Sequence, residues 1–479
     1  MTMGKTSPDE RGRISGSDPM GVPVTADLLR EYDRPGPRYT SYPTAVEFAG
    51  SFDEAAYRRQ LDAAAEKAEE PLSLYLHLPF CEERCSFCGC MVIITRRREV
   101  AAHYLGYLKR EIEMLAARLK GRRRVVQYHW GGGTPTYLSV PQMTALHEAV
   151  TRHFDVQPGA EVAIEVDPRV TSREQIERLR ELGFNRLSLG VQDFTPEVQQ
   201  AINRIQSELE TRALFEVARS LGYASINVDL IYGLPFQTRA SFGRSVEAVV
   251  ALRPDRVAVY SYAHVPWIRG NQKRIRPEDL PSRELKIELF LEAMERFLAA
   301  GYRQIGMDHF ALAEDELARA AEQRRLHRNF MGYTTRPAAD MVGLGVSAIG
   351  RVGAAFAQNT KKLSVYYAAL EAGRFPIERG YLLDADDELR AHVITELMCN
   401  FHLERARVEA RFGIDFDRYF APELAELRAG PVAHGFLEVG GEGLLVTPKG
   451  RLFVRNLCMV FDRYLRARTL DKPVFSRTI

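Results

Sequence analysis

YLHLPFCEERCSFCGC (residues 75–90) places three cysteines, Cys81, Cys85 and Cys88, in a C-x3-C-x2-C pattern directly after a short apolar run. Thiolates spaced this closely usually bind a metal. Three ligands on one loop can bind three irons of a four-iron cluster and leave the fourth iron without a protein ligand. Such an open iron is available for chemistry, whereas a fully ligated cluster is usually limited to electron transfer.

The spacing alone leaves three interpretations open. A structural zinc site usually needs four ligands in two separated C-x2-C pairs. Cys90 could be a fourth ligand, but it lies only two positions after Cys88, and the chain has no second C-x2-C pair. The spacing therefore favours an iron–sulfur cluster over a zinc site or unliganded thiols. The isolated Cys399 and Cys458 are expected to be buried core residues.

Composition narrows the class of protein. The chain has 479 residues, with 65 Lys and Arg against 63 Asp and Glu, so its formal charge of +2 gives no indication of a nucleic-acid partner. The basic clusters Arg96–Arg98 and Arg122–Arg124 are expected on a solvated surface, or as attractors of a polyanionic substrate. No apolar run has membrane-spanning length, and no segment near the start has the pattern of a signal peptide. Six cysteines without disulfide-framework spacing predict a cytoplasmic protein with no membrane partner.

Short β-type runs alternate with amphipathic helical runs from about residue 71. The strands are expected at Leu72–Leu76, Val125–Trp130, Glu161–Val166, Arg186–Leu189, Ile226–Ile231, Arg256–Tyr262 and Gln304–Met307, and the helices at 99–119, 141–153, 172–182, 208–220, 240–251 and 283–299. Such alternation predicts parallel βαβ units in an α/β fold, either a doubly wound sheet or a full or partial (β/α) barrel.

Helix ends are marked along this repeat. Thr171 and Glu174 have capping-box spacing at the start of the helix expected over 172–182. Gly183, Gly222 and Gly301 each follow a helical run and precede an aromatic residue, which predicts helix termination by a left-handed glycine.

Polar and glycine-rich residues follow the expected strands one after another. Both candidate folds carry their chemistry at the carboxyl ends of parallel strands. A glycine run, HWGGGTPT at 129–136, follows the second strand and can bring backbone close to a ligand. The other polar groups at or just past strand ends include Glu165, Gln192, Arg204 and Asp229. Together they predict one shared site for a zwitterionic ligand that carries hydroxyl groups.

The chain divides into three parts. Residues 1–50 are expected to be an N-terminal extension, in which the composition of 1–22 predicts disorder and the Pro- and Tyr-rich stretch 23–50 is expected to lie extended on the body. Residues 51–375 contain the βα repeat. Residues 376–479 are mainly helical, with a hairpin near Phe436–Val446 and a final helix that opens at Thr447-Pro448. Helices followed by a hairpin are compatible with a winged-helix module. The segment lacks the concentrated Lys and Arg surface of a DNA-binding domain, which favours a docking or lid role over DNA reading.

The cysteine loop, the glycine run and the βα repeat together resemble the radical S-adenosylmethionine enzymes. The resemblance is closer to the oxygen-independent coproporphyrinogen III oxidases and runs from about residue 30 to the C-terminus. Its motifs are RYTSYPT at 38–44, LHLPFCEERCSFCGC at 76–90, HWGGGTPT at 129–136, EVDPR at 165–169, LSLGVQDF at 187–194, NVDLIYGLP at 227–235, GMDHFA at 306–311, LHRNFMGYTT at 326–335 and NLCMVFDRYL at 456–465.

This resemblance implies a fold, two cofactors and a set of site residues. The fold would be a partial (β/α)6 barrel with an N-terminal extension and a mainly helical C-terminal domain. Cys81, Cys85 and Cys88 would hold one [4Fe–4S] cluster, and Cys90 would be an extra cysteine that is not a ligand. Met91 stands where this family carries a polar Asn. The residues implied to contact S-adenosylmethionine are Tyr75, Phe87, Gly132, Gly133, Thr134, Glu165, Gln192, Arg204, Asp229, Ala263 and Ile349.

The resemblance also implies a reaction, in which two propionate side chains of coproporphyrinogen III are oxidatively decarboxylated to vinyl groups. The product would be protoporphyrinogen IX, formed through a 5′-deoxyadenosyl radical in anaerobic haem biosynthesis by a monomeric enzyme. An electron donor such as flavodoxin or ferredoxin would reduce the cluster. The substrate has four carboxylates, so Arg and Tyr side chains are expected to line its pocket. The candidate substrate contacts near the chain ends are Arg38, Tyr39, Asn456 and Met459.

Two other functions compete with this interpretation. A haem-binding chaperone of the same superfamily would keep the cluster loop without oxidase activity, but RYTSYPT and Cys90 favour the oxidases. The second competitor is a zinc or winged-helix binding module without catalysis.

Overall fold

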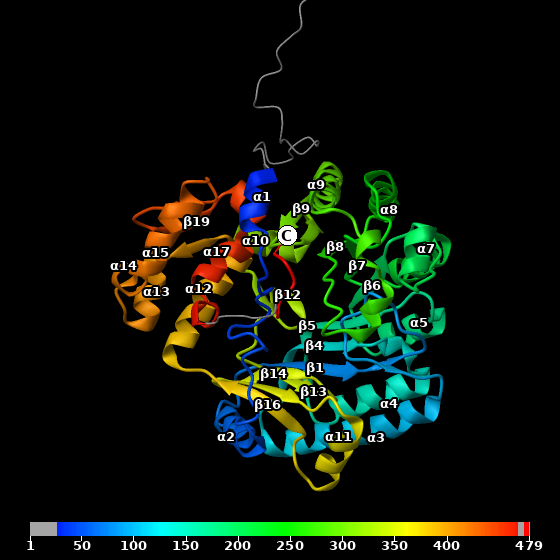
Figure 1. Cartoon of the computed structure of the whole chain (residues 1–479). Coiled ribbons are helices and arrows are strands. Elements are labelled where there is room, and N and C mark those ends of the chain that lie inside the picture. The colour runs from blue at the N-terminus through cyan, green and yellow to red at the C-terminus, as the bar shows by residue number, and fades with distance from the viewer. Residues whose placement is uncertain (1–25, 468–473, 479) are drawn as a thin grey trace, which may run out of the picture.

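A twelve-stranded mixed sheet forms the body of the protein (Figure 1). The computed structural model describes residues 26–467 and 474–478. The segment 1–22, for which composition predicts disorder, lies outside these residues. The sheet order is β16-β15-β14-β13-β1-β4-β5-β6-β7-β8-β10-β9.

Six parallel βα units form the centre of this sheet. The strands are β1 (Leu72–Leu78), β4 (Arg124–Gly132), β5 (Asp155–Val166), β6 (Arg186–Gln192), β7 (Ser225–Tyr232) and β8 (Arg256–Ser261). The helices that follow them are α3 (Arg98–Arg118), α4 (Val140–Thr151), α5 (Arg173–Glu181), α7 (Glu208–Ser220), α8 (Arg239–Leu252) and α9 (Arg283–Ala299). These strands keep their chain order without the reversal of a doubly wound sheet, and helices lie around the outside of the curved sheet (Figure 1). The sheet has two free edges, β16 and β9, so the barrel is partial.

Alternation along β1 sorts its side chains between two environments. Leu72, Leu74 and Leu76 are fully buried in the main hydrophobic core. The residues between them face the polar inside of the barrel, where Ser73 donates a hydrogen bond to Gln127. This period of two places polar groups inside a sheet whose outer face is apolar.

Antiparallel strands extend the sheet at both edges. Parallel β13 (Asp340–Leu344) pairs with β1 and is followed by antiparallel β14 (Ile349–Val352), β15 (Ala355–Asn359) and β16 (Ile377–Leu382). On the other edge lie β10 (His309–Leu312) and β9 (Tyr302–Ile305). The strand predicted at Gln304–Met307 is therefore not a seventh parallel strand. It starts earlier and pairs antiparallel with β10, because the chain turns back at Gly306, where φ is +60°.

Two details of the local predictions can be compared with the structure. The capping box predicted at Thr171 is wrong by one residue, since Ser172 and Gln175 form it. The Thr171 hydroxyl instead donates to the backbone oxygen of Asp167 and to Thr136, which fixes the turn after β5. The glycine terminations are confirmed, with positive φ values of 92°, 72° and 89° at Gly183, Gly222 and Gly301.

The first described residues form helix α1 (Ala26–Tyr32), although an extended segment was predicted there. The chain beyond it is largely irregular, and Tyr39 and Tyr42 are buried in the second hydrophobic cluster together with the C-terminal helices. One expected surface residue is also buried: Arg122 is fully buried and paired with Asp340, so the basic cluster it belongs to is only partly solvated.

The C-terminal part is mainly helical and contains a small three-stranded sheet of order β17-β19-β18. Thr447 caps helix α16, as predicted, but α16 is not the final helix, since α17 and α18 follow it. Its elements are α12 (Ala385–Asn400), β17 (His402–Glu404), α13 (Arg405–Phe412), α14 (Phe416–Tyr419), α15 (Ala421–Leu427), β18 (Leu437–Val439), β19 (Gly443–Val446), α16 (Pro448–Arg451), α17 (Val454–Val460) and α18 (Arg463–Ala467).

The remaining elements are short or lie between the main units. They are α2 (Glu54–Ala65), β2 (Phe80–Cys81), β3 (Ile93–Ile94), α6 (Pro196–Ala201), α10 (Glu316–Glu322), β11 (His327–Asn329), β12 (Gly332–Thr334) and α11 (Leu363–Glu371). Among the helices of the described chain, none combines the length and the hydropathy required to span a bilayer.

Candidate active site

The three cysteines of the C-x3-C-x2-C pattern line one cavity of about 280 Å³ at the carboxyl ends of the parallel strands. Their loop follows β1, and its backbone is held by amide side chains of neighbouring loops, above all by Asn271. The Asn271 amide donates to the backbone oxygens of Cys85 and Cys88, at 3.2 and 3.0 Å. In residues 26–467 and 474–478 no three His, Cys, Asp or Glu side chains converge as ligands of one metal ion. A cubane cluster does not need such convergence, because each thiolate binds a different iron.

Charged groups surround the buried Cys85. The guanidinium groups of Arg169 and Arg204 each approach its Sγ at 3.9 Å. Asp167 accepts hydrogen bonds from both, at 2.7 Å from Arg169 and 2.9 Å from Arg204. Burial alone would raise the pKa of Asp167, but these two cations lower it. The carboxylate is thus held ionised and fixes two cations beside a thiol, which favours a negatively charged sulfur ligand.

The glycine run packs directly on the cysteine loop. Gly133 and Thr134 donate their backbone N–H groups to Leu78 and Phe80, at 2.9 and 2.8 Å. Gly132 has φ +124°, and a Cβ atom there would lie 2.7 Å from the ring of His77. Only glycine fits this close approach, so the run forms a backbone cradle on the wall of the cavity.

The four polar residues predicted at strand ends meet in the same cavity. Glu165, Gln192, Arg204 and Asp229 all line it together with the cysteines. Glu165 accepts a 3.0 Å hydrogen bond from the Gly132 N–H. Although burial opposes ionisation, the nearby His129 lowers the pKa of Glu165.

Asp229 differs from Glu165, since burial raises its pKa to about 6. It accepts hydrogen bonds from Asn227 at 2.8 Å and from the Ser188 hydroxyl at 3.2 Å. The cavity therefore holds two ionised carboxylates, Asp167 and Glu165, and a third, Asp229, that titrates near neutrality, beside the Arg204 cation. Hydroxyl, ammonium and carboxylate groups of a ligand all find partners in this set.

Three residues predicted at the S-adenosylmethionine site do not line this cavity. Tyr75 lies within β1, before the loop that carries the cysteines. Its ring stacks on that of His129, with the centroids 5.9 Å apart, and its hydroxyl lies 3.0 Å from His77 Nδ1. The Ala263 backbone oxygen accepts from the Gln272 amide, which also donates to Phe87. Ile349 opens β14, two strands away from β1. Phe87, Gly132, Gly133 and Thr134 line the cavity as predicted.

Sequence reasoning did not single out Asp167, Arg169 or Asn271. The first two belong to the quoted EVDPR motif, so their position just past a strand end was an available indication. Asn271 lies in an irregular loop with no pattern that distinguishes it from other polar residues.

The candidate substrate contacts near the chain ends are engaged within the protein. Arg38 forms an ion pair with Asp308, and the Tyr39 hydroxyl donates to Asp462 at 2.9 Å. Asn456 donates to the Tyr32 backbone oxygen at 2.7 Å. Met459 packs so closely on Gly36 that a Cβ atom there would lie 2.5 Å from its sulfur. Of these four residues, Tyr39 also lines a second cavity, described below.

Residue 91, where the family resemblance breaks, contributes through its backbone. His77 Nε2 lies 3.1 Å from the Met91 oxygen, and the Met91 side chain packs against the main core. The thiols predicted to be core residues, Cys399 and Cys458, are both buried, and all six cysteines are free.

Comparison with known proteins shows the class of protein to which this chain belongs. Residues 75–249 match the Radical SAM superfamily model, and residues 383–453 match the HemN C-terminal domain model. The fold and the cysteine-lined cavity thus define a radical S-adenosylmethionine protein with a partial barrel, as predicted.

Relatives of nearly equal length give the family. The oxygen-independent coproporphyrinogen III oxidase of Pseudomonas aeruginosa is 48% identical over 95% of this chain and 98% of its own. Its Escherichia coli counterpart is 46% identical over 94% and 98%. The solved structure of coproporphyrinogen III oxidase (HemN) from Escherichia coli, described as a radical SAM enzyme, matches with a TM-score of 0.85 over 89% of this chain and 97% of that one. The chain belongs to the family of oxygen-independent coproporphyrinogen III oxidases.

The residues present fit the cofactors of this family, a [4Fe–4S] cluster and S-adenosylmethionine. Three thiols share one cavity, and Arg204 Nε in its wall is buried without a protein partner. The glycine cradle leaves backbone room beside them. A donor-rich cavity of this kind suits a ligand with carboxylate and hydroxyl groups.

Proposed function

We propose that this protein converts coproporphyrinogen III to protoporphyrinogen IX by oxidative decarboxylation of two propionate side chains to vinyl groups. The observation that carries the proposal is the shared cavity, in which the three cysteines, the glycine cradle and the polar strand ends meet. The full-length relatives named above support the same reaction.

The bound cofactors supply the reducing electron and the carbon radical that removes a hydrogen atom from an unactivated substrate carbon. Cys81, Cys85 and Cys88 would hold the cluster, and the backbone at Gly132 and Gly133 would lie against the bound ligand. The remaining work of the protein is to orient the substrate and exclude water.

The polar strand ends have separate roles in this proposal. Glu165, kept ionised by His129, would accept hydrogen bonds from an ammonium or hydroxyl group. Asp229, which is protonated for part of the time near neutral pH, can accept or donate. Arg204 would pair with a carboxylate while Asp167 holds it in place.

The partners and the compartment follow from the same chemistry. We propose that a one-electron carrier such as flavodoxin or ferredoxin reduces the cluster, since nothing in the proposed substrate supplies that electron. The free state of all six cysteines supports a reducing cytoplasm. We also propose that the enzyme is a monomer.

The experiment is anaerobic turnover with the cysteine variants. Alanine at Cys81, Cys85 or Cys88 is expected to abolish both the visible absorbance of the cluster and vinyl product. Alanine at Cys90 is the matched control and is expected to retain the iron and sulfide content. Haem binding by the wild type without any vinyl product would instead favour the chaperone function, and a cluster retained in all four variants would refute the ligand set.

A further inference from the structure

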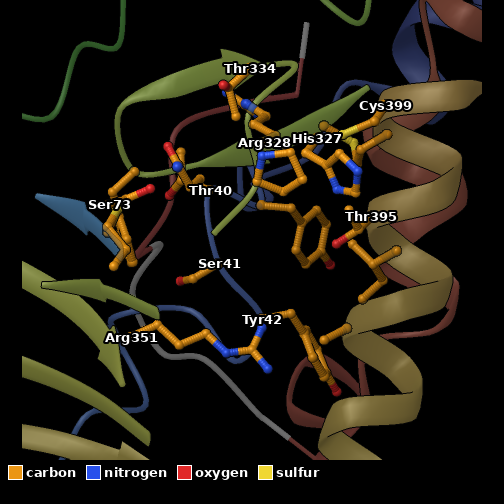
Figure 2. Close-up of a pocket in the computed structure, with 18 of the residues that line it drawn as sticks. Thr40, Ser41, Tyr42, Ser73, His327, Arg328, Thr334, Arg351, Thr395 and Cys399 are labelled. Atoms are coloured by element: carbon orange, nitrogen blue, oxygen red, sulfur yellow. The ribbon is translucent and has the colours of Figure 1, made fainter. Parts of the chain in front are cut away.

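A second cavity, of about 210 Å³, lies between the barrel and the C-terminal helices (Figure 2). None of its lining residues lines the cysteine cavity. Residues 39–42 form one wall, the β11–β12 hairpin a second and helix α12 a third. Its floor includes Ser73 of β1, Met341 of β13 and Arg351 of β14.

The lining of this cavity carries positive charge and no acid. Arg328 and Arg351 line it together with Tyr39, Tyr42 and several hydroxyl side chains, and no Asp or Glu is among them. His327 also lines it, but burial lowers the pKa of His327, so its ring is neutral near pH 7. Figure 2 shows the Arg351 side chain extending across the cavity toward Tyr42. The charged groups of the lining are therefore both cations, and they lie beside hydroxyl groups and an apolar surface that includes Phe330, Phe356 and Ile394.

Arg351 forms no direct ion pair. Glu388 and Asp340 favour its charged form from a distance, and Asp340 is itself paired with Arg122. Within the described parts of the chain, no carboxylate lies within 4.0 Å of the Arg351 guanidinium, and its Nε is buried without a hydrogen-bond partner. Its contact is with the Phe356 ring, 5.8 Å from the guanidinium carbon. The Nε of Arg328 is buried and unpartnered as well, although its terminal nitrogen donates to the Arg38 backbone oxygen at 2.7 Å. Both side chains are half-buried. A buried N–H group without an acceptor is unfavourable, so an anionic ligand that accepts from these Nε groups would relieve a cost that the folded protein carries.

The strand register relates this cavity to the cofactor site. Ser73 pairs with Met341, and Met341 pairs with Arg351, so these three residues form one row across the sheet. The row above it includes Tyr75, two residues after Ser73 on β1, and Ile349, two residues before Arg351 on the antiparallel β14. Both are implied by the family resemblance to contact S-adenosylmethionine. Two residues along a strand span about 7 Å. A ligand in the second cavity would thus lie one row below the cofactor, on the same face of the sheet.

We propose that the second cavity binds carboxylates of the substrate other than the one being removed, with Arg351 as the central cation and Arg328 beside it. This inference rests on the proposed function, which requires a substrate with several carboxylate arms. One carboxylate arm must reach the row of Tyr75 and Ile349, here called the cofactor row, while the other arms are bound elsewhere. Arg351, one row below, provides a cation that can bind one of those other arms. Arg351 is a positioning residue, because it holds the substrate at a distance from the reacting carbon.

The test is binding of coproporphyrin III, the stable oxidised tetracarboxylate, to anaerobically purified holoenzyme. Its tetramethyl ester is the uncharged comparison. The variants are Arg351→Gln and Arg351→Lys, with Arg374→Gln as an exposed arginine control. A variant at a second lining position, Thr395→Glu, places a carboxylate in the cavity and leaves Arg351 intact.

Loss of a charge-assisted hydrogen bond predicts a Kd for the tetra-acid that is about 10- to 100-fold higher in Arg351→Gln. Arg351→Lys should recover part of the affinity, Thr395→Glu should match the loss, and Arg374→Gln should bind as the wild type does. The ester should bind equally to all variants. Iron content and S-adenosylmethionine affinity should be unchanged, while the KM for coproporphyrinogen III rises with the Kd.

Wild-type affinity for the tetra-acid in both Arg351→Gln and Thr395→Glu would overturn the proposal. Binding of citrate or phosphate that depends on Arg351, without such dependence for the tetra-acid, would also overturn it, because the site would then serve a small free anion. If the wild type forms vinyl product and the variants bind normally, the cavity proposal fails and the proposed function stands. If the wild type forms no vinyl product but binds the tetra-acid through Arg351, the proposed function fails and the carboxylate site stands.

Discussion

Replacement of Asp167 by Asn tests whether a buried carboxylate organises the cluster site. Asp167 is 7% exposed and accepts hydrogen bonds from Arg169 and Arg204, at 2.7 and 2.9 Å. Asn preserves the shape and one acceptor oxygen but removes the charge. Two guanidinium groups beside Cys85 would then lack their counter-charge.

The magnitude follows from burial. Removing one partner from a buried ion pair costs about 3–5 kcal/mol, because the remaining charge is left uncompensated. Exposed ion pairs contribute much less to the free energy of unfolding, about 0–1 kcal/mol. Arg253 and Glu314 form such a pair, with N···O 3.2 Å and side chains 60% and 66% exposed. Glu314→Gln is therefore the matched control and should change the free energy of unfolding by less than about 1 kcal/mol.

The assay is urea unfolding of the cluster-free protein, with iron and sulfide analysis of the anaerobically isolated protein. The folded-state pKa of Asp167 lies below its ordinary value, so its contribution to stability is present above the unfolded pKa of about 4 and is lost only in acid. The deficit of Asp167→Asn should thus be constant between pH 6 and 8. A loss no larger than that of Glu314→Gln, with normal iron content, would refute the reasoning.

Two further predictions concern the cradle and the barrel wall. Gly132→Ala should bind S-adenosylmethionine at least about tenfold more weakly, because the added Cβ would lie 2.7 Å from His77. Equilibrium dialysis measures this affinity. Gly121→Ala is the control, since nothing lies within 4 Å of a Cβ atom there. Burial raises the pKa of Glu111 to about 7, so the folded state holds a proton that the unfolded state releases, and stability should fall by about 3 kcal/mol between pH 4.5 and 7. Glu111→Gln should remove that part of the slope of unfolding free energy against pH, and an unchanged slope would contradict the assignment.

The parallel repeat could be predicted from the sequence because each strand and helix has its own local period. Strand ends followed from the same pattern, so Glu165 and Asp229 could be placed in one site before the structure was known. The antiparallel strands β14–β16, and the parallel strand β13 beside them, had no such local indication. All four are short, and they join the barrel only through the pairing of β13 with β1, which lies far earlier in the chain. Local propensity does not report such a pairing. Arg351 was missed for that reason, since its importance depends on the register that aligns it with Ser73.

Register also links the stability of the barrel to its chemistry. The fully buried Leu74 and Leu76 fix β1 against the core, and the alternation between faces then sets where its polar residues lie. Ser73 reaches the second cavity, and Tyr75 stacks on His129 one row above. A shift of β1 by one residue would exchange the two faces, placing leucines inside the barrel and polar groups in the core. The hydrophobic pattern that stabilises β1 therefore also aligns the proposed carboxylate-binding row, which holds Ser73, with the cofactor row, which holds Tyr75. Because both rows depend on the same strand register, neither site can be repositioned without the other.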